Sequence, residues 1–312
     1  MWRRLVAVFG AGAPLVQEAR GHSYVLPATT TSVVECEWPR AERQRRPRGW
    51  NHKQTRARCM PFYLMHELTR EALRDLAPSA IVLLPTGATE QHGPHLPVGT
   101  DTLAVECIAR EAAQRAGEQI TVSVAPTLPF GSSHHHLPFG GTMSLSTETY
   151  YRVVRELAES LIISGFRRIF ILNGHGGNNE LIQLVARDLA LAHPVHLAAA
   201  SYWTIAREAL IGVEAHGYGR FPGHAGAFET SLVLAMRPEL VSASLPHRDD
   251  PACFELHPPV SYRLERHGAW HTIDGYTDSP DRADRVRGQA FLTAISEAVS
   301  EALVQFHAQT RG

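Results

Sequence analysis

Residues 83–102 read LLPTGATEQHGPHLPVGTDT, so that Glu90, His92 and Asp101 stand among glycines and prolines. An apolar run at residues 80–84 leads into this stretch and a helical pattern follows it, which predicts a rigid loop at the carboxyl end of a buried strand. Glu90 and His92 are two positions apart, so an extended backbone directs both side chains to the same face. Asp101 falls at the expected start of a helix, where free backbone N–H groups favour a carboxylate.

These three side chains carry ligand atoms for metal ions. Carboxylate oxygen and imidazole nitrogen suit zinc, manganese or iron, and a carboxylate can bridge two ions. Taken one at a time, Asp101 is better explained as a helix cap and His92 as a loop residue. Taken together, in a rigid loop beyond an apolar strand, they predict a metal site.

The composition is that of an ordinary globular chain of 312 residues with a net charge of −1. This charge balance gives no reason to expect nucleic acid or an acidic membrane as a partner, and no apolar run is long enough to span a membrane. The four cysteines show no CxxC spacing and no disulfide framework, which fits a reducing cytoplasm; they are Cys36, Cys59, Cys107 and Cys253.

The first 59 residues differ from the rest, because eleven Lys and Arg stand there against four Asp and Glu, a net charge of roughly +7. Three interpretations compete: an export signal, a disordered basic extension and a translation start assigned too far upstream. A weak cleavage region and an Arg-rich, Pro-containing continuation favour the last two. Residues 60–312 are the expected folded domain, and a helical pattern follows Met60 directly, through Leu64, Leu68, Leu73 and Leu76.

Beyond Met60 the pattern alternates between short apolar runs and longer amphipathic segments. The predicted strands are residues 80–84, 120–125, 168–172 and 195–199. The predicted helices are residues 103–117, 147–164, 178–192, 225–236 and 282–306. This alternation predicts an α/β fold with a mainly parallel central sheet between two helical layers, and ligands in such folds bind beyond the carboxyl ends of the strands.

A second loop of this kind follows the predicted strand 168–172. Residues 173–178 read Asn-Gly-His-Gly-Gly-Asn, which places His175 in a tight turn at the carboxyl end of a strand. A surface histidine in an ordinary turn is the alternative. Because the topology of the first loop recurs here, we expect His175 to face the same site.

Residues 131–142 form a third candidate loop with a triplet of histidines. Adjacent histidines cannot all converge on one ion from an ordinary backbone, so at least two of them point elsewhere. We expect His136 to point inward, and Ser133 and Thr142 to contact substrate. Trp203 is a candidate aromatic wall for a planar substrate, with core packing as its alternative role.

Two further residues stand at and inside the predicted helix 225–236. His224 precedes the helix, and imidazole titrates near neutrality, so it is a candidate general acid or base. Glu229 lies within the helix and can complete a metal shell or orient a water molecule. An exposed histidine and a surface glutamate are the alternative. Residues 268–278 contain aromatics in a turn-rich stretch, and the sequence does not distinguish a surface loop from a rim or a subunit contact.

The motifs Glu-Gln-His-Gly-Pro-His-Leu-Pro with Thr-Asp-Thr, Asn-Gly-His-Gly-Gly-Asn and His-Ala-Gly with Glu-Thr-Ser together resemble the creatininase (creatinine amidohydrolase) family, from about Met60 to the C-terminus. The resemblance implies a three-layer α/β/α fold, a homohexamer and a hydrolase of amide-type C–N bonds. It implies two divalent ions per chain (Zn, Mn or Fe), a water that the ions activate and a small-molecule amide substrate. The implied metal ligands are Glu90, His92, Asp101 as the bridge, and His175, with His224 transferring the proton.

One departure from the family pattern concerns the substrate. Creatininase proper has a Tyr and then a Glu after Asn-Gly-His, whereas this chain has Gly176 and Gly177. The Gly-Gly form is similar to formamidopyrimidine deformylases and to the peptidase that trims the mycofactocin precursor, which are alternative functions within the family. A metal-binding scaffold without turnover is the alternative from another class, although His224 and Glu229 argue against it.

Overall fold

The computed structural model describes residues 62–218, 221–249 and 264–311. Five parallel strands form one sheet in the order β1-β3-β2-β4-β5. Their bounds are Phe62–Leu64 (β1), Ile81–Thr86 (β2), Val122–Val124 (β3), Arg168–Asn173 (β4) and His196–Ser201 (β5). The predicted extension 1–59 lies outside the described residues and stays a prediction.

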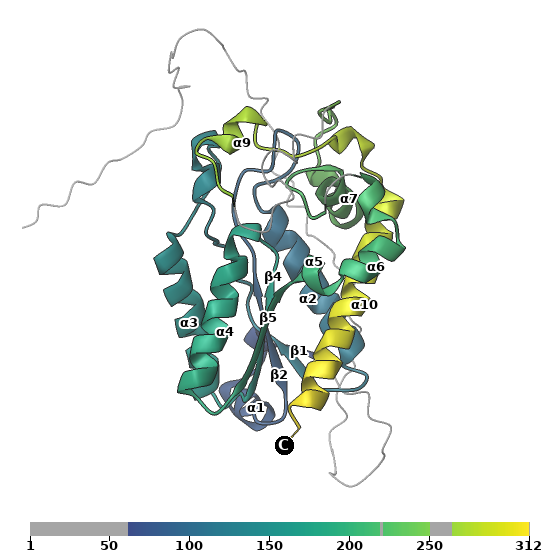
Figure 1. The fold of residues 1–312 in the computed structure, drawn as a ribbon. Helices are drawn as coiled ribbons and strands as arrows, with labels where there is room; N and C mark the ends of the chain where they lie inside the picture. The colour runs from purple at the N-terminus through teal and green to yellow at the C-terminus, as the bar shows by residue number, and fades with distance from the viewer. Residues whose placement is uncertain (1–61, 219–220, 250–263, 312) are drawn as a thin grey trace, which may run out of the picture. The chain divides into compact units, whose positions relative to one another are not determined.

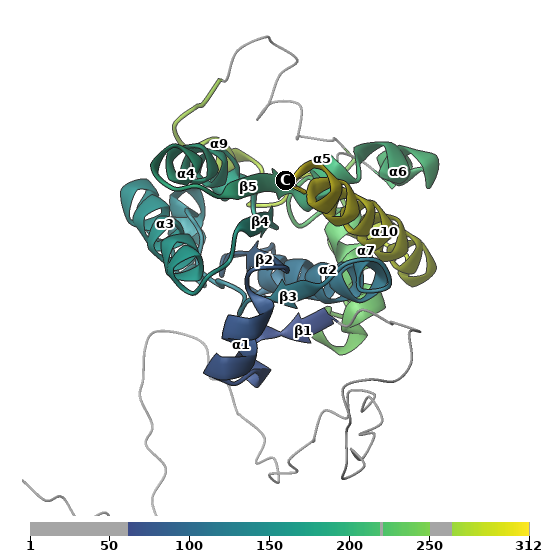
Figure 2. The ribbon, with the colours of Figure 1, turned by 90° about the horizontal axis from the view of Figure 1, so that it is seen from below.

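Helices cover both faces of this sheet (Figures 1 and 2). One face carries α2 (Thr100–Ala116), α5 (Tyr202–Ile205), α6 (Arg207–Gly212), α7 (Ala227–Met236) and α10 (Arg285–Gln309). The other carries α1 (Arg70–Leu76), α3 (Thr147–Ile163) and α4 (Asn179–Ala192), while α9 (Ala269–Thr272) lies beyond the end of the sheet. Short 3₁₀ helices are Met65–Glu67, His134–Phe139, Gly176–Asn178, Ala215–Tyr218, Pro238–Leu240 and Pro280–Arg282. The predicted three-layer α/β/α fold is confirmed.

Strand β2 shows why the sheet needs a helical layer on each side. All six of its residues are buried. Ile81 and Leu83 join the apolar core that α2 and α10 cover, whereas Val82 and Leu84 join the core under α3 and α4. Because successive side chains of a strand point to opposite faces, both faces of β2 are apolar and both must be covered.

The order of the strands places a crevice at the carboxyl ends of β2 and β4. The chain passes from β2 to β3 on one side and then crosses back to β4 on the other side, and ligands bind at such a switch point. The loops after these two strands meet there, since the N–H of Gly174 donates to the carbonyl oxygen of Thr86 at 2.8 Å.

The prediction of a helix running from Leu64 is wrong at its beginning. Residues 62–64 form β1, which pairs with β3, and α1 begins only at Arg70. The side chain of Thr69 caps α1 by accepting a hydrogen bond from the N–H of Ala72 at 3.2 Å. Pairing with a neighbouring strand therefore outweighs the helical spacing of the leucines.

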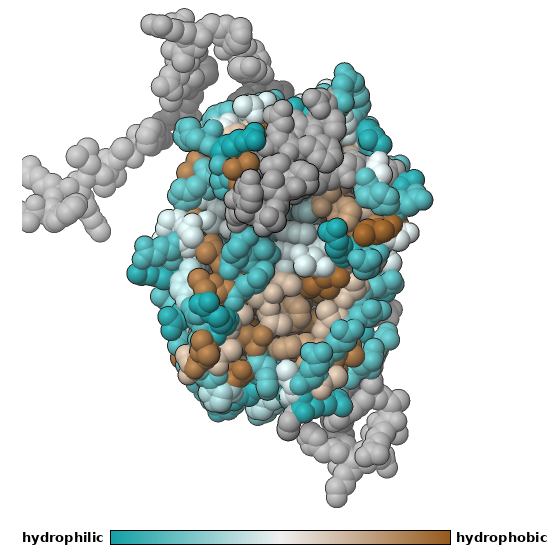
Figure 3. Space-filling model, in the orientation of Figure 1, coloured by the Kyte–Doolittle hydropathy of each residue, from teal (hydrophilic) through white to brown (hydrophobic). Residues whose placement is uncertain are grey.

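Strand β5 is an edge of the sheet, and its residues 197–200 are only half-buried. Figure 3 shows apolar residues gathered on the face where Figure 1 places β5 between α4 and α10. In the part of the chain that is described, no helix is both long and apolar enough to cross a bilayer.

The contact between α7 and α10 gives a test of the packing. A Cβ added at Gly288 in α10 would lie 1.9 Å from the carbonyl oxygen of Ser231 in α7. We expect Gly288→Ala to lower the free energy of unfolding by about 1–3 kcal/mol, because the two helices must move apart. Urea denaturation measures this change.

Gly212→Ala is the matched control, because an added Cβ at Gly212 in α6 meets no atom within 4 Å. We expect it to leave the free energy of unfolding unchanged or to raise it by up to about 1 kcal/mol, since alanine favours helix. Equal denaturation midpoints for both variants would contradict the packing argument.

Candidate metal centre

The loop after β2 supplies two buried side chains of the centre. Glu90 is 1% exposed and His92 is 0% exposed. Nδ1 of His92 donates a hydrogen bond to the carbonyl oxygen of Glu90 at 3.1 Å. This bond leaves Nε2 of His92 free to face the other carboxylates, which is how imidazole ligands are oriented in metal sites.

Asp101 lies in the first turn of α2, where the positive end of the helix dipole stabilises a carboxylate. Its Oδ1 is 3.2 Å from Nε2 of His92, and its Oδ2 is 3.0 Å from Nδ1 of His175. One carboxylate therefore lies between imidazoles that two different loops carry.

The loop after β4 holds His175 through a set of asparagine hydrogen bonds. Nδ1 of His175 is 3.2 Å from Oε1 of Glu90. The N–H of His175 donates to Oδ1 of Asn173 at 3.1 Å, and the side chain of Asn178 donates to the carbonyl oxygen of Gly87 at 3.0 Å. These bonds tie the loop of His175 to the loop of Glu90.

A strained turn before α7 brings the last two predicted residues to the cluster. Ala225 has φ 49°, in the left-handed region that residues other than glycine rarely adopt. Its N–H donates to Oε2 of Glu229 at 2.6 Å, and the same oxygen is 3.8 Å from Nε2 of His92. Nδ1 of His224 lies 3.6 Å from Oε1 of Glu90.

The structure thus brings together the six residues that the sequence predicts as ligands or catalysts. All six are at most 6% exposed; they are Glu90, His92, Asp101, His175, His224 and Glu229. Their assignment to metal binding or to catalysis stays a prediction.

Two of the predicted substrate contacts make hydrogen bonds that hold the centre together. Oγ of Ser133 lies 3.2 Å from Nε2 of His175. Oγ1 of Thr142 accepts a hydrogen bond from the N–H of Gln91 at 3.0 Å. His136, by contrast, faces the cluster directly, with Nε2 3.6 Å from Oε1 of Glu90.

Trp203, the candidate aromatic wall of the substrate site, packs against the apolar core. The ring of Trp203 packs edge-on against Tyr202, with centroids 4.9 Å apart, and contacts the core that α2 and α10 cover. Trp270 of α9 lies against the cluster instead, with its ring centroid 4.6 Å from that of His136 and 5.3 Å from that of His224. The stretch 268–278, which the sequence left undecided, therefore contacts the centre.

Gln91 is a further buried residue of the centre that the sequence analysis did not single out. Its side chain lies within hydrogen-bond distance of His136 and His224. Its position between Glu90 and His92 was the available signal, but strand alternation directs it away from them.

The electrostatics of the buried cluster call for a cation. Burial alone would lower the pKa of His92, but the carboxylates of Asp101 and Glu229 raise it to about 10. Neighbouring carboxylates likewise raise the pKa of His175 well above its usual range, against the effect of burial. Burial raises the pKa of the Glu229 carboxyl to about 8. Without an ion, protons thus supply the positive charge that the carboxylates need.

Carboxylate oxygens without a hydrogen-bond partner also indicate a cation site. Both carboxylate oxygens of Glu90 and Oδ2 of Asp101 are buried without a hydrogen-bond partner among the described residues. Buried polar atoms are normally hydrogen-bonded or bound to a metal. Ligand atoms of Glu90, His92 and Asp101 lie within 4.8 Å of one another, as do those of His92, His224 and Glu229. The residues fit a metal site.

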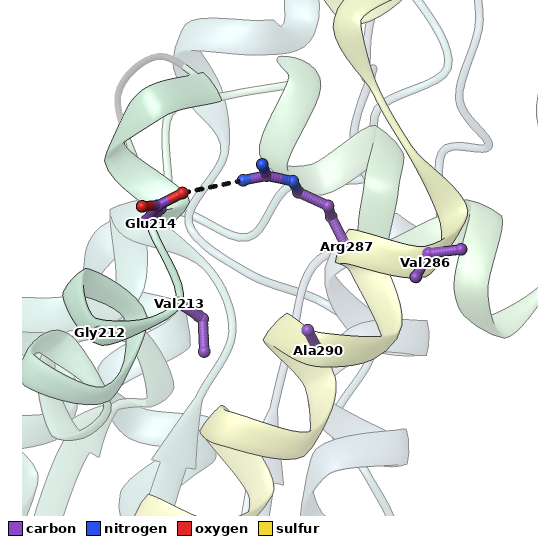
Figure 4. A pocket seen from close by; sticks show the side chains of 6 residues that line it. All are labelled: Gly212, Val213, Glu214, Val286, Arg287 and Ala290. Atoms are coloured by element: carbon purple, nitrogen blue, oxygen red, sulfur yellow. Dashed lines mark ion pairs between the residues drawn. The ribbon is translucent and has the colours of Figure 1, made fainter.

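A hollow lies between the end of α6 and the start of α10 (Figure 4). Its volume is about 310 Å³, and it contains one ion pair, between Glu214 and Arg287 at 3.7 Å. The hollow shares no residue with the cluster, and we assign it no role in the chemistry.

A buried carboxylate–imidazole cluster beyond the strands of a parallel α/β sheet fits the class of metal-dependent enzymes. The profile of the creatininase family, described as creatinine amidohydrolase, matches residues 66–303, and the chain belongs to this family. The resemblance found in the sequence is therefore confirmed.

Individual relatives agree. The creatinine amidohydrolase of Pseudomonas putida is 30% identical over 247 residues, which cover 74% of this chain and 91% of the relative. The mycofactocin precursor peptide peptidase of Mycobacterium ulcerans is 34% identical over 165 residues, which cover 51% of this chain and 60% of the peptidase. A solved structure described as creatininase with Mn has a TM-score of 0.65 at 28% identity, covering 78% of this chain and 97% of its own. A creatininase variant described as the Zn-Zn type is equally similar.

The raised pKa values predict that metal binding depends on pH. An ion must displace protons from His92 and Glu229, so we expect manganese to bind more tightly at pH 8 than at pH 7, about tenfold for each proton released. Calorimetry in two buffers of different ionisation enthalpy measures the affinity and the released protons. Equal affinity at both pH values would contradict the prediction.

The matched variants for this titration are Asp101→Asn and Asp75→Asn. Asp101 lies between two imidazoles, so we expect its substitution to weaken manganese binding by at least about 100-fold. Asp75 is exposed on α1, and its substitution is expected to leave the affinity unchanged.

A second test concerns Gly177. An added Cβ would lie 2.2 Å from the carbonyl oxygen of Ser132 and 2.7 Å from Nε2 of His175. We expect Gly177→Ala to displace His175 and to lower the metal content of the purified protein to below half of the wild-type value. Gly176→Ala, where an added Cβ meets no atom within 4 Å, is expected to keep the full content. Equal metal contents in the two variants would refute this.

Proposed function

We propose that this chain is an amidohydrolase with two divalent ions (Zn, Mn or Fe), which cleaves a non-peptide or cyclic amide C–N bond of a small molecule. The observation that carries the proposal is the position of Asp101, whose two oxygens face the imidazoles of His92 and His175 at 3.2 and 3.0 Å. A carboxylate so placed is suited to bridge two ions.

The remaining ligands divide between the two ends of Asp101. Glu90 and His175 lie at one end of this carboxylate and would hold one ion with it, whereas His92 and Glu229 lie at the other end and would hold the second. Glu229 supplies a carboxylate to this chain, in which Gly177 stands where creatininase proper has a Glu. Bound ions would polarise the substrate carbonyl and lower the pKa of water.

His224 is suited to move the proton. Burial, and next to it the neighbouring imidazoles, lower the pKa of His224 well below its usual range, so the ring is neutral at neutral pH. Its Nε2 donates to the carbonyl oxygen of Gln91 at 3.0 Å, which leaves Nδ1 as the proton-accepting atom beside Glu90. Nδ1 would take a proton at the start of the reaction and give it to the leaving nitrogen.

The names of the relatives suggest which substrates to consider for this chain. Names among them include creatinine amidohydrolase, mycofactocin precursor peptide peptidase and, from Thermotoga maritima, 3-dehydro-scyllo-inosose hydrolase. Gly176 and Gly177 favour a substrate other than creatinine, and a precursor peptide or a formamidopyrimidine is the alternative within the family. We also propose a cytoplasmic homohexamer, which rests on the family resemblance and on the cysteine pattern alone.

Metal analysis beside turnover assays tests this function. We expect about two divalent ions per chain after reconstitution, and hydrolysis of a member of a panel of cyclic amides, formamides and peptides, with little or no turnover of creatinine. No bound metal after reconstitution would overturn the proposal. Efficient turnover of creatinine would overturn the inference from Gly176 and Gly177.

Substitution of His224 separates a catalyst from a metal-binding scaffold. We expect His224→Gln to lower kcat by about 100-fold or more while the metal content stays unchanged, because the variant loses the proton-accepting nitrogen. Steady-state kinetics and metal analysis measure the two quantities. His216→Gln is the control, since His216 is exposed. Unchanged kcat in His224→Gln would exclude the role of this imidazole.

A further inference from the structure

The orientation of the Gln91 side chain is fixed by two backbone groups of opposite kind. Its Oε1 accepts a hydrogen bond from the N–H of Gly93 at 2.9 Å. Its Nε2 donates to the carbonyl oxygen of Gly275, also at 2.9 Å. A flipped amide would turn oxygen toward a carbonyl and NH₂ toward an N–H, and both hydrogen bonds would be lost.

The same nitrogen lies close to two imidazoles. Nε2 of Gln91 is 2.9 Å from Nδ1 of His136 and 3.0 Å from Nε2 of His224. It carries two protons, and one of them goes to Gly275. Nε2 of His224 is 3.0 Å both from this amide nitrogen, which can only donate, and from the carbonyl oxygen of Gln91, which can only accept. We assign the ring proton to the bond with the carbonyl oxygen, because Nδ1 of His92 makes the same kind of bond to the carbonyl oxygen of Glu90. The second amide proton therefore goes to Nδ1 of His136.

Three of the four buried imidazoles around Glu90 share one arrangement. Each has a nitrogen bound to a backbone carbonyl oxygen: that of Glu90 for His92, of Ser132 for His175 and of Gln91 for His224. The other nitrogen of each ring therefore faces a carboxylate of the cluster.

His136 is the exception among these rings. Its Nδ1 accepts from Gln91, so its proton is on Nε2, which is 3.6 Å from Oε1 of Glu90 and thus beyond hydrogen-bond length. The ring is held in place by stacking on His224, with centroids 4.1 Å apart and planes 17° apart, and by Trp270. A protonated ring nitrogen cannot coordinate a metal ion.

We propose that Gln91 is a positioning residue that holds His136 as the Nε2–H tautomer, so that His136 offers a hydrogen bond to the bound substrate and does not bind metal. This inference rests on the proposed function for its substrate, an amide whose carbonyl oxygen accepts the hydrogen bond. The donor of His136 and the acceptor of His224 then lie side by side, on two stacked rings.

Nitrogen NMR of the full chain, labelled with ¹⁵N in the histidine rings, tests the tautomer. We expect Nδ1 of His136 to be unprotonated and Nε2 to be protonated, both before and after zinc is added, with the signals assigned from His136→Gln. Gln91→Glu offers an acceptor in place of a donor, so Nδ1 of His136 should gain a proton. Gln114→Glu, the same change at an exposed position of α2, should leave the spectrum unchanged.

Two NMR results would overturn the proposal: a protonated Nδ1 of His136 in the wild-type protein, or an unchanged His136 spectrum in Gln91→Glu. The wild-type spectrum alone decides the first point, even if the Gln91 variant does not fold. A structural role for Gln91 without control of the tautomer would alter stability but not the position of the proton.

Zinc binding separates this proposal from the proposed function. His136→Gln keeps an N–H near the position of Nε2, and we expect its zinc stoichiometry and affinity to stay within twofold of wild type. A loss of zinc in this variant would make His136 a ligand and overturn the inference. His175→Gln should lose zinc; if it keeps zinc, the proposed metal centre fails while the NMR result on His136 stands.

Discussion

The shared carboxylate of Asp101 depends on the register of two strands. His92 follows β2 and His175 follows β4, and these strands pair in parallel with Thr86 opposite Asn173. A slip of one residue would turn the side chains of a strand to the opposite face. The sheet therefore determines the distance between the two imidazoles, and the start of α2 places the carboxylate between them.

The burial of these side chains makes their electrostatic interactions strong. Three carboxylates are buried close to one another, those of Glu90, Asp101 and Glu229. Buried anions without compensation are strongly unfavourable. We therefore expect most substitutions that change the charge of the cluster to destabilise the fold. Positive charge, from protons on the imidazoles or from bound cations, must balance the carboxylates at this edge of the sheet.

Local sequence patterns were enough to predict most of the helices and strands and most of the candidate metal ligands. The apolar run before Glu90 and the periodicity after Asp101 correspond to β2 and α2, and Asp101 lies in the first helical turn as expected. Spacing within a segment does not reveal partners from distant segments, so the places of Trp270 and Gln91 were not predicted. Trp203 follows β5, but packing in the core determines its contacts. Leu64 matched a helical period, and a strand partner far along the chain outweighed it.

The hydrogen bond from Gln91 to the carbonyl oxygen of Gly275 joins residues 184 positions apart. Contacts of such long sequence separation require the closure of large loops and slow the folding of a chain. During synthesis, the loop of Gln91 leaves the ribosome long before its partner exists. The hydrogen-bond network of Gln91 is therefore complete only after Gly275 has been synthesised and has folded against the loop that follows β2.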